Sequence, residues 1–263
     1  MFGAWRRWRR RRVRERPFPA AWREHLVERV PLYQELDDAE RAELEGHVQV
    51  LLAEKHFEGC DGLEITDEVR VTIAGHAALL LLHRDTDYFS RLQTVLVYPR
   101  GYHAHGEERL PDGTVVEGKR GRLGESWTGG VVVLSWADLL GGAQNPRDGQ
   151  NVALHEFAHQ LDQEDGQADG APVLEGGRRA YAAWAHALAP EFERLQARVQ
   201  KGRRTDLDAY GATNPAEFFA VVTEAFFERP EKLEKRHPEL YAALAEFYVQ
   251  DPAARRRARR GRE

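Results

Sequence analysis

Residues Val152 to Asp162 read Val-Ala-Leu-His155-Glu156-Phe-Ala-His159-Gln-Leu-Asp and contain the most informative motif of the chain. Histidines four residues apart share one face of a helix, so both imidazoles can reach a single cation. Glu156 follows the first histidine and would stand beside that cation, where a carboxylate can serve as a general base. Apolar residues surround the motif and would bury the other side of an amphipathic helix. The stretch therefore predicts a metal-binding helix of the HExxH type.

A catalytic zinc site takes three protein ligands and keeps an open position for water, so a third ligand is needed. In the metzincin arrangement a glycine and a further histidine follow the helix, but here Asp162 and Asp165 occupy those places. The same arrangement requires a methionine turn, and Met1 is the only methionine in the chain. This route to a third ligand is therefore disfavoured.

The other route is a glutamate from a later helix. Residues 214–224 supply Glu217 and Glu224, which lie seven residues apart and so on one helical face. Glu217 has a competing explanation, because Asn214 as N-cap and Pro215 at the first helical position would place it in a capping box. Spacing alone favours Glu217 only slightly. Glu224 stays open as a spare ligand, a carboxylate that supports a ligand, or a charge on the helix surface.

Other residues have both a chemical and a structural interpretation. Tyr210 lies in a glycine-bearing loop and could point its phenol at an oxyanion, although a single tyrosine is often a packing residue. Asp162 lies one turn after His159 and could accept a ring N–H, or could be a polar residue near the helix end. His103 and His105 could hold a second metal, but a solvated pair is the preferred interpretation.

Composition narrows the class of protein. The chain has 263 residues, 42% hydrophobic and 31% charged, with a mean hydropathy of −0.62, which predicts a globular protein with a solvated surface. The longest apolar run, residues 77–82, is too short to cross a bilayer, and no apolar segment follows the N-terminal arginines as in a signal peptide. Cys60 is the only cysteine, so we expect no internal disulfide and a cytoplasmic location.

The charge is unevenly distributed along the chain. The first 16 residues hold eight arginines against Glu15, and residues 255–263 hold six against Glu263, whereas residues 17–254 carry a net charge of −17. We expect a basic N-terminal arm over 1–16, one domain over 17–252 and a basic tail over 253–263. Frayed, solvated ends are the preferred interpretation, and the alternatives are contact with nucleic acid or anionic lipid, or folding back onto the acidic body.

The hydrophobic periodicity predicts an α+β domain. Helices are predicted over 20–29, 37–57, 66–82, 149–162, 176–201, 214–227 and 238–250, and strands over 92–98 and 131–136. Residues 100–130 are rich in glycine and charge and are predicted to form loops and short hairpin strands, with a turn at 111–113.

Three blocks of sequence resemble the MtfA (Mlc titration factor A) family of bacterial zinc-dependent peptidases. They are residues 155–162, residues 208–221, which read Asp-Ala-Tyr-Gly-Ala-Thr-Asn-Pro-Ala-Glu-Phe-Phe-Ala-Val, and residues 226–230, which read Phe-Phe-Glu-Arg-Pro. The resemblance extends in outline over most of residues 17–252, including 95–99 and 126–136, and leaves the arginine-rich ends outside.

The resemblance implies a gluzincin-like site with one Zn²⁺, in which His155, His159 and Glu217 are the ligands, Glu156 is the general base and Tyr210 stabilises the transition state. It also implies a cytoplasmic protein with aminopeptidase-like activity on peptides, which binds the glucose repressor Mlc and so derepresses glucose uptake by the phosphotransferase system. In zincin-like folds a strand such as 131–136 forms the edge that aligns an extended peptide, and the alternative is an ordinary core strand.

The prediction is therefore a monomeric, zincin-like α+β metallopeptidase domain with a small mixed sheet, the HExxH helix and additional helices at both ends. Two other functions stay open. The protein could be a regulatory protein that sequesters a transcriptional repressor, with the metal site secondary, or a peptidase associated with nucleic acid through its arginine-rich ends.

Overall fold

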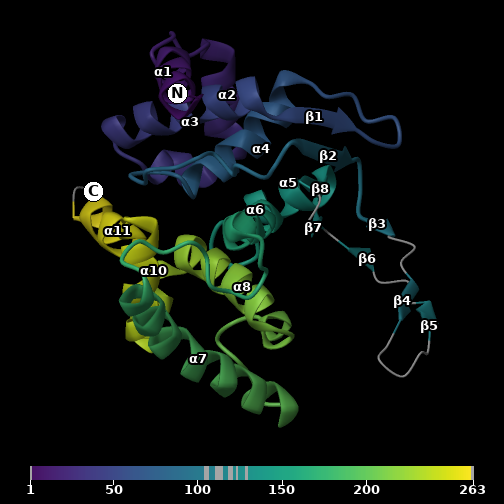
Figure 1. The fold of residues 1–263 in the computed structure, drawn as a ribbon, viewed down its shortest axis with the longest axis vertical. Helices are drawn as coiled ribbons and strands as arrows, with labels where there is room; N and C mark the ends of the chain where they lie inside the picture. The colour runs from purple at the N-terminus through teal and green to yellow at the C-terminus, as the bar shows by residue number, and fades with distance from the viewer. Residues whose placement is uncertain are drawn as a thin grey trace.

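A mixed sheet with the strand order β1-β2-β8-β7 organises the molecule (Figure 1). The computed structural model describes residues 2–103, 107–109, 115–117, 121–122, 124–127 and 130–261. Strands β1 (His56–Gly59), β2 (Thr94–Tyr98) and β8 (Val131–Ser135) are parallel, and β7 (Gly124–Trp127) runs antiparallel to β8. The fold is α+β, as predicted, because a mostly helical chain contains this one small mixed sheet and two short strand pairs.

The N-terminal helices pack together to the left of β1 and β2 in the view of Figure 1: α1 (Phe2–Arg14), α2 (Ala20–Arg29), α3 (Asp38–Glu54) and α4 (Asp67–Leu79). Local capping explains where two of them begin. The Asp37 side chain accepts from Glu40 in a capping box at the start of α3, and Thr66 accepts from Val69 N at the start of α4. The predictions for α2, α3 and α4 are confirmed to within a few residues, apart from the end of α3.

The prediction that α3 continues to residue 57 is wrong. Helix α3 ends at Glu54, and the next residues form β1, which pairs with β2 over His56–Thr94 to Gly59–Val97. Lys55 marks the change, because its buried ammonium donates to the carbonyl oxygens of Phe89 and Leu92. This pairing is between segments far apart in sequence, so helical periodicity alone could not reveal it.

The second half of the chain is mostly helical. Its helices are α5 (Trp136–Gln144), α6 (Val152–Asp162), α7 (Arg178–Gln200), α8 (Pro215–Glu228), α9 (Pro230–Arg236), α10 (Pro238–Tyr248) and α11 (Pro252–Arg260). Short 3₁₀ turns lie at Pro31–Glu35 (η1), Gln163–Asp165 (η2) and Ala209–Ala212 (η3). Helices α6, α7, α8 and α10 confirm four predictions, whereas α5, α9 and α11 were not predicted.

Two small hairpin-like pairings follow β2, in agreement with the prediction of short strands over 100–130. Strand β3 (Tyr102–His103) pairs with β6 (Gly121–Arg122), and β4 (Glu107–Arg109) pairs with β5 (Val115–Glu117), both antiparallel. The predicted turn at 111–113 and the residue His105 lie outside the described residues.

The position of β8 corrects one expectation. Strand β8 lies between β2 and β7, and its side chains from Val132 to Ser135 are buried, so it is an internal core strand and does not form the edge of the sheet. It also ends one residue earlier than predicted, because Ser135 caps α5 by accepting from Asp138 N. The edge strand on this side is β7, which contacts α6.

The described parts of both basic ends are folded, so the expectation of frayed, solvated ends is wrong for them. On α1, Arg10 is buried and donates to Glu54 and Asp87, while Val13 joins the hydrophobic core. On α11, Arg255 pairs with Glu40 and Arg256 pairs with Glu35. The alternative of folding back onto the acidic body is the one that the structure shows.

A close approach between α2 and α4 provides a test of the packing. A Cβ atom at Gly75 would lie 2.6 Å from Leu26 Cδ2 and 3.0 Å from Val30 Cγ2, in a fully buried contact. We expect Gly75→Ala to destabilise the protein by about 1–3 kcal/mol, because the two helices must separate. Urea unfolding followed by circular dichroism measures this change.

The matched control is Gly141→Ala. Gly141 is an exposed position in α5 where a Cβ atom would meet nothing within 4 Å. Alanine is the better helix former, so this change should be neutral or stabilise by up to about 1 kcal/mol. Equal effects of the two substitutions would contradict the α2–α4 contact.

Candidate metal centre

Helix α6 presents both histidines of the HExxH motif toward the same point. Asn151 caps the helix by accepting from Leu154 N at 3.1 Å, which fixes where the first turn begins. The Nε2 atoms of His155 and His159 lie 3.3 Å apart, and both side chains are largely buried. The predicted arrangement of two imidazoles on one helical face is therefore present.

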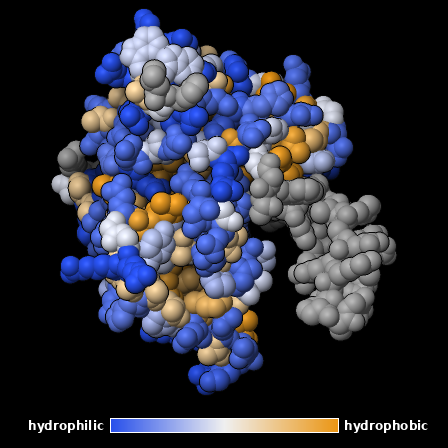
Figure 2. Space-filling view, in the orientation of Figure 1, coloured by the Kyte–Doolittle hydropathy of each residue, from blue (hydrophilic) through white to orange (hydrophobic). Residues whose placement is uncertain are grey.

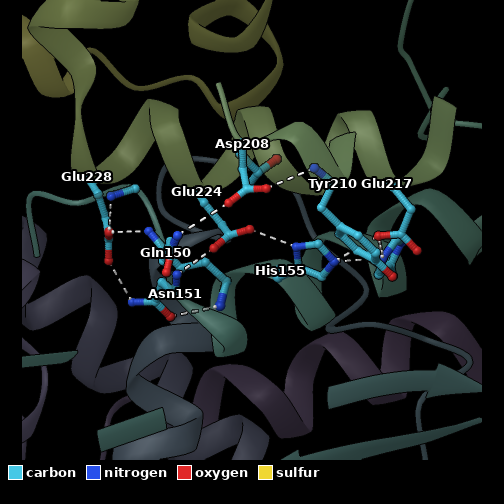
Figure 3. Close-up of polar contacts among 12 residues, drawn as sticks. Gln150, Asn151, His155, Asp208, Tyr210, Glu217, Glu224 and Glu228 are labelled. Carbon is cyan, nitrogen blue, oxygen red and sulfur yellow. Dashed lines mark hydrogen bonds and ion pairs between the residues drawn. The ribbon is translucent and has the colours of Figure 1, made fainter. Parts of the chain in front are cut away.

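Helix α8 brings Glu217 to the same point. Its Oε2 atom lies 3.0 Å from His155 Nε2 and 3.4 Å from His159 Nε2. Asn214 accepts from Glu217 N at 2.9 Å, so the backbone of Glu217 takes part in a helix cap while its carboxylate faces the imidazoles (Figure 3). The predicted cap by Asn214 is therefore present, but the Glu217 carboxylate faces the imidazoles and does not complete a capping box.

The three side chains form a donor set that suits a divalent metal ion. One ligand atom each from His155, His159 and Glu217 lies within 4.8 Å of the others. Among the described residues, these three form the cluster of histidine and acidic side chains that is compact enough to hold a metal ion. Two imidazole nitrogens and one carboxylate oxygen are a typical set for catalytic zinc.

Electrostatics around His155 also favour a cation. Burial lowers the pKa of His155, but hydrogen bonds to Glu217 and Glu224 outweigh burial and raise it to about 10. Glu156, which is buried on α6, adds to the negative potential at this imidazole. The residues therefore fit a bound metal ion.

Glu224 holds the opposite edge of the first imidazole. Its Oε1 atom lies 2.7 Å from His155 Nδ1, and its Oε2 atom accepts from Asn151 N (Figure 3). A carboxylate at Nδ1 leaves Nε2 available toward Glu217 and fixes the ring orientation. Among the roles considered from sequence, Glu224 thus has the geometry of a carboxylate that supports a ligand.

Glu228 extends this carboxylate row and was not noticed in the sequence. Its buried side chain accepts from Gly149 N and Gln150 N, each at 3.0 Å, and from Asn151 Nδ2 at 3.0 Å (Figure 3). Glu217, Glu224 and Glu228 lie at spacings of seven and four, so they line one face of α8. That periodicity is the signal that could have revealed Glu228.

Tyr210 lies beside the histidines, as expected for a residue at the site. It belongs to η3, where the Asp208 side chain accepts from Tyr210 N at 2.8 Å. The ring centroids of Tyr210 and His155 are 6.0 Å apart, and the side chain is 54% exposed (Figure 3). The side chain is thus half-buried beside His155, so the interpretation of a packing residue and that of a residue facing the substrate both stay open.

Asp162 does not join the site. Asp162 is fully buried, and burial raises its pKa to about 6. Its Oδ2 atom accepts from Gly170 N, while Oδ1 has no hydrogen-bond partner among the described residues. Of the two interpretations given above, the bond to a histidine ring is therefore not found. The paired-histidine hypothesis cannot be placed, because His105 and the side chain of His103 lie outside the described residues.

Comparison with known proteins agrees with this geometry. The family described as glucose-regulated metallo-peptidase M90 matches residues 5–249. The uncharacterized protein slr2042 of Synechocystis sp. is 41% identical over 250 residues, which cover 94% of this chain and 90% of that protein. Proteins named Mlc titration factor A from Serratia proteamaculans and Yersinia pestis are each 34% identical over 241 residues, which cover 90% of this chain and 89% and 86% of theirs. The match includes most of α1, which the sequence resemblance had left outside.

The buried carboxyl of Glu228 generates a pH prediction. Burial raises its pKa to about 8, although the hydrogen bond from Asn151 favours the charged form. The unfolded value is about 4.3, so the contribution of this group to stability is full below that pH and is lost as the pH rises through about 8. We expect the unfolding free energy of the wild type to fall by roughly 1–3 kcal/mol from this group between about pH 5 and pH 8.5.

Glu228→Gln is neutral at every pH and should lack this decrease. The measurement is urea unfolding at both pH values for the wild type, Glu228→Gln and Glu246→Gln. Glu246 is exposed on α10 and controls for the chemical change itself. Parallel pH dependences for the wild type and Glu228→Gln would refute the assignment.

Proposed function

Because the chain belongs to the glucose-regulated metallopeptidase family M90, we propose that it is a zinc-dependent peptidase of the gluzincin type. The observation that carries this proposal is the convergence of His155, His159 and Glu217 from two helices, with their ligand atoms within 4.8 Å of one another. These three residues would hold one zinc ion.

The residues around the ion have distinct roles in this proposal. A zinc ion bound there supplies Lewis acidity, which polarises a peptide carbonyl and lowers the pKa of water. Glu156 takes a proton from the attacking water and passes it to the leaving amine. Tyr210 donates its phenolic proton in a hydrogen bond to the developing oxyanion. Glu224 keeps the His155 ring in place from the other side.

A peptide is the substrate class that this arrangement suits. Strand β7 is the edge strand next to α6, and its outer backbone groups have no strand partner among the described residues. An extended peptide can add to such an edge with its scissile bond toward the helix. Aminopeptidase-like cleavage is the proposed form of the activity, in a cytoplasmic protein.

A second candidate function is binding of an Mlc-like transcriptional repressor. It is favoured by the relatives named Mlc titration factor A, which match 90% of the chain. In that case repressor binding would couple the protein to glucose uptake, and the metal centre would be secondary.

Metal analysis tests the ligand assignment. We expect the wild type to bind one zinc ion per chain, and His155→Ala and Glu217→Ala to lose it, because each removes one of three ligands. Glu224→Gln should keep the ion at saturating zinc with an affinity lower by about 10–100-fold, because it supports a ligand without being one. Zinc content by elemental analysis and zinc affinity by competition with a chelator measure both effects. Loss of stoichiometric zinc only from Glu224→Gln would reverse the assignment.

Substitution of the proposed base separates catalysis from binding. Glu156→Gln should retain zinc but lose about 10²–10⁴-fold in hydrolysis of aminoacyl chromogenic substrates, because it removes the proton acceptor. A wild-type protein that binds zinc and hydrolyses no peptide substrate would refute the proposed enzyme. If Glu156→Gln still derepresses a sugar-uptake operon, the repressor-binding function is supported independently of catalysis.

A further inference from the structure

Helix α1 has a buried face and an exposed aromatic face. Arg10 and Val13 are 8% and 7% exposed and fix the inner face against the body. Trp5 and Trp8 are 58% and 46% exposed, among the most exposed large hydrophobic side chains of the described residues. Because they are three positions apart on a helix, the two indoles lie on the same outer face.

Arginines accompany the tryptophans on this face. The guanidinium of Arg9 lies 5.9 Å from the centre of the Trp5 ring, and that of Arg12 lies 4.9 Å from the Trp8 ring. Both contacts join residues four apart, so each indole carries a cation on the next turn. The outer face of α1 is therefore a row of paired indole and guanidinium groups.

The arginines of α1 differ from those of α11 in their partners. On α11, four arginines form ion pairs with carboxylates of the body: Arg255 with Glu40, Arg256 with Glu35, Arg257 with Glu234 and Arg260 with Glu231. On α1, exposed Arg7, Arg9 and Arg12 form no ion pair with any carboxylate in the described part of the chain. The α11 charges thus stabilise the fold, whereas these three α1 charges are free for an external anion.

The position of α1 makes its outer face accessible. The helix lies at the upper end of the molecule in Figure 1. In Figure 2 this end is mostly blue or near white, which marks hydrophilic residues and residues of intermediate hydropathy. Residues 17–254 carry a net charge of −17, so an anionic partner is attracted only near the basic helices.

We propose that α1 binds the surface of a bilayer that contains anionic phospholipids, with Trp5 and Trp8 at the interface and Arg9 and Arg12 at the phosphates. Arg7 lies outside the aromatic face and adds its exposed positive charge to the attraction. Exposed tryptophans beside arginines on one helix face are the chemistry of an interfacial helix. None of the described helices is long and apolar enough to span a membrane, so the contact is peripheral. A bilayer is favoured over nucleic acid because two exposed indoles can enter the interfacial region of a bilayer, whereas contacts to nucleic-acid phosphates would use the arginines alone.

Preorganisation supports this proposal. Most short amphipathic segments fold only when they bind a membrane, and the conformational entropy that they lose on folding opposes binding. Here α1 is already helical, because Arg10 bonds to Glu54 and Asp87 and Val13 packs in the core. The indoles are therefore held outward before any bilayer is present.

Vesicle co-sedimentation of the full-length protein tests the proposal. We expect binding to vesicles of phosphatidylcholine with phosphatidylglycerol, no binding to phosphatidylcholine alone, and weaker binding at high salt. Replacing Arg7, Arg9 and Arg12 by glutamine should weaken binding by about 100-fold. The tryptophan emission of the wild type should shift to shorter wavelength on binding, and the double variant Trp5→Ala and Trp8→Ala should lose that shift.

The matched control replaces Arg178, Arg179 and Arg203 by glutamine, which removes the same charge from exposed positions outside α1. This variant should bind like the wild type. The proposal is overturned if anionic vesicles are not bound, if both triple variants lose binding equally, or if an oligonucleotide competes the protein off the vesicles through α1. Thermal unfolding of each variant checks that the fold is retained. We expect no large change in the unfolding temperature, because all substituted side chains are exposed.

Discussion

The metal centre depends on the contact between the start of α6 and the carboxylates of α8. Three consecutive backbone amides, at residues 149–151, donate to Glu228 and Glu224. These amides precede the first turn of α6, where N–H groups lack partners in the helix itself and the helix dipole is positive. Carboxylates from α8 satisfy them, and the same face of α8 carries Glu217 to the histidines. One row of glutamates thus positions the metal-binding helix and completes its ligand set.

Burial makes that contact specific. Glu224 and Glu228 are 7% and 1% exposed, so a displaced carboxylate would leave unsatisfied donors in the interior. Asn151 joins the two functions, since its side chain caps α6 and also donates to Glu228. Its Nδ2 atom lies 3.5 Å from His76 on α4, which links the N-terminal helices to the same cluster. The helices of the first half therefore support the site although they provide none of its candidate ligands.

The two arginine-rich ends have become different structures. Helix α11 carries Arg256, which donates to the carbonyl oxygens of Phe227 and Glu228 at the end of α8 as well as to Glu35. It therefore closes the C-terminus of the helix that carries Glu217 and favours the dipole there. Helix α1 instead leaves its indoles and several guanidiniums on the outside. Although both ends are rich in arginine, α11 stabilises the fold through contacts with the body, whereas α1 presents several of its arginines on the surface.

The local features could be predicted from the order of the residues alone. The HExxH spacing, the cap at Asn214 and the periodicities of α6 and α8 were readable because neighbours along a helix interact within a few residues. Family resemblance, read from blocks around Tyr210 and Glu217, indicated the correct fold class. The choice between Glu217 and Glu224 could not be made from spacing, since both lie on one face of α8.

Other features depend on the packing of distant segments: which carboxylate faces which imidazole nitrogen, the pairing of residues 56–59 with β2, and the internal position of β8. The folding of the arginine-rich ends onto the body also depends on this packing, because their partners Glu54, Glu35 and Glu40 lie far away in the chain. The physical reason is the same in each case. These contacts join segments separated by tens to hundreds of residues, so they depend on how the helices pack and leave no periodic signal in the sequence.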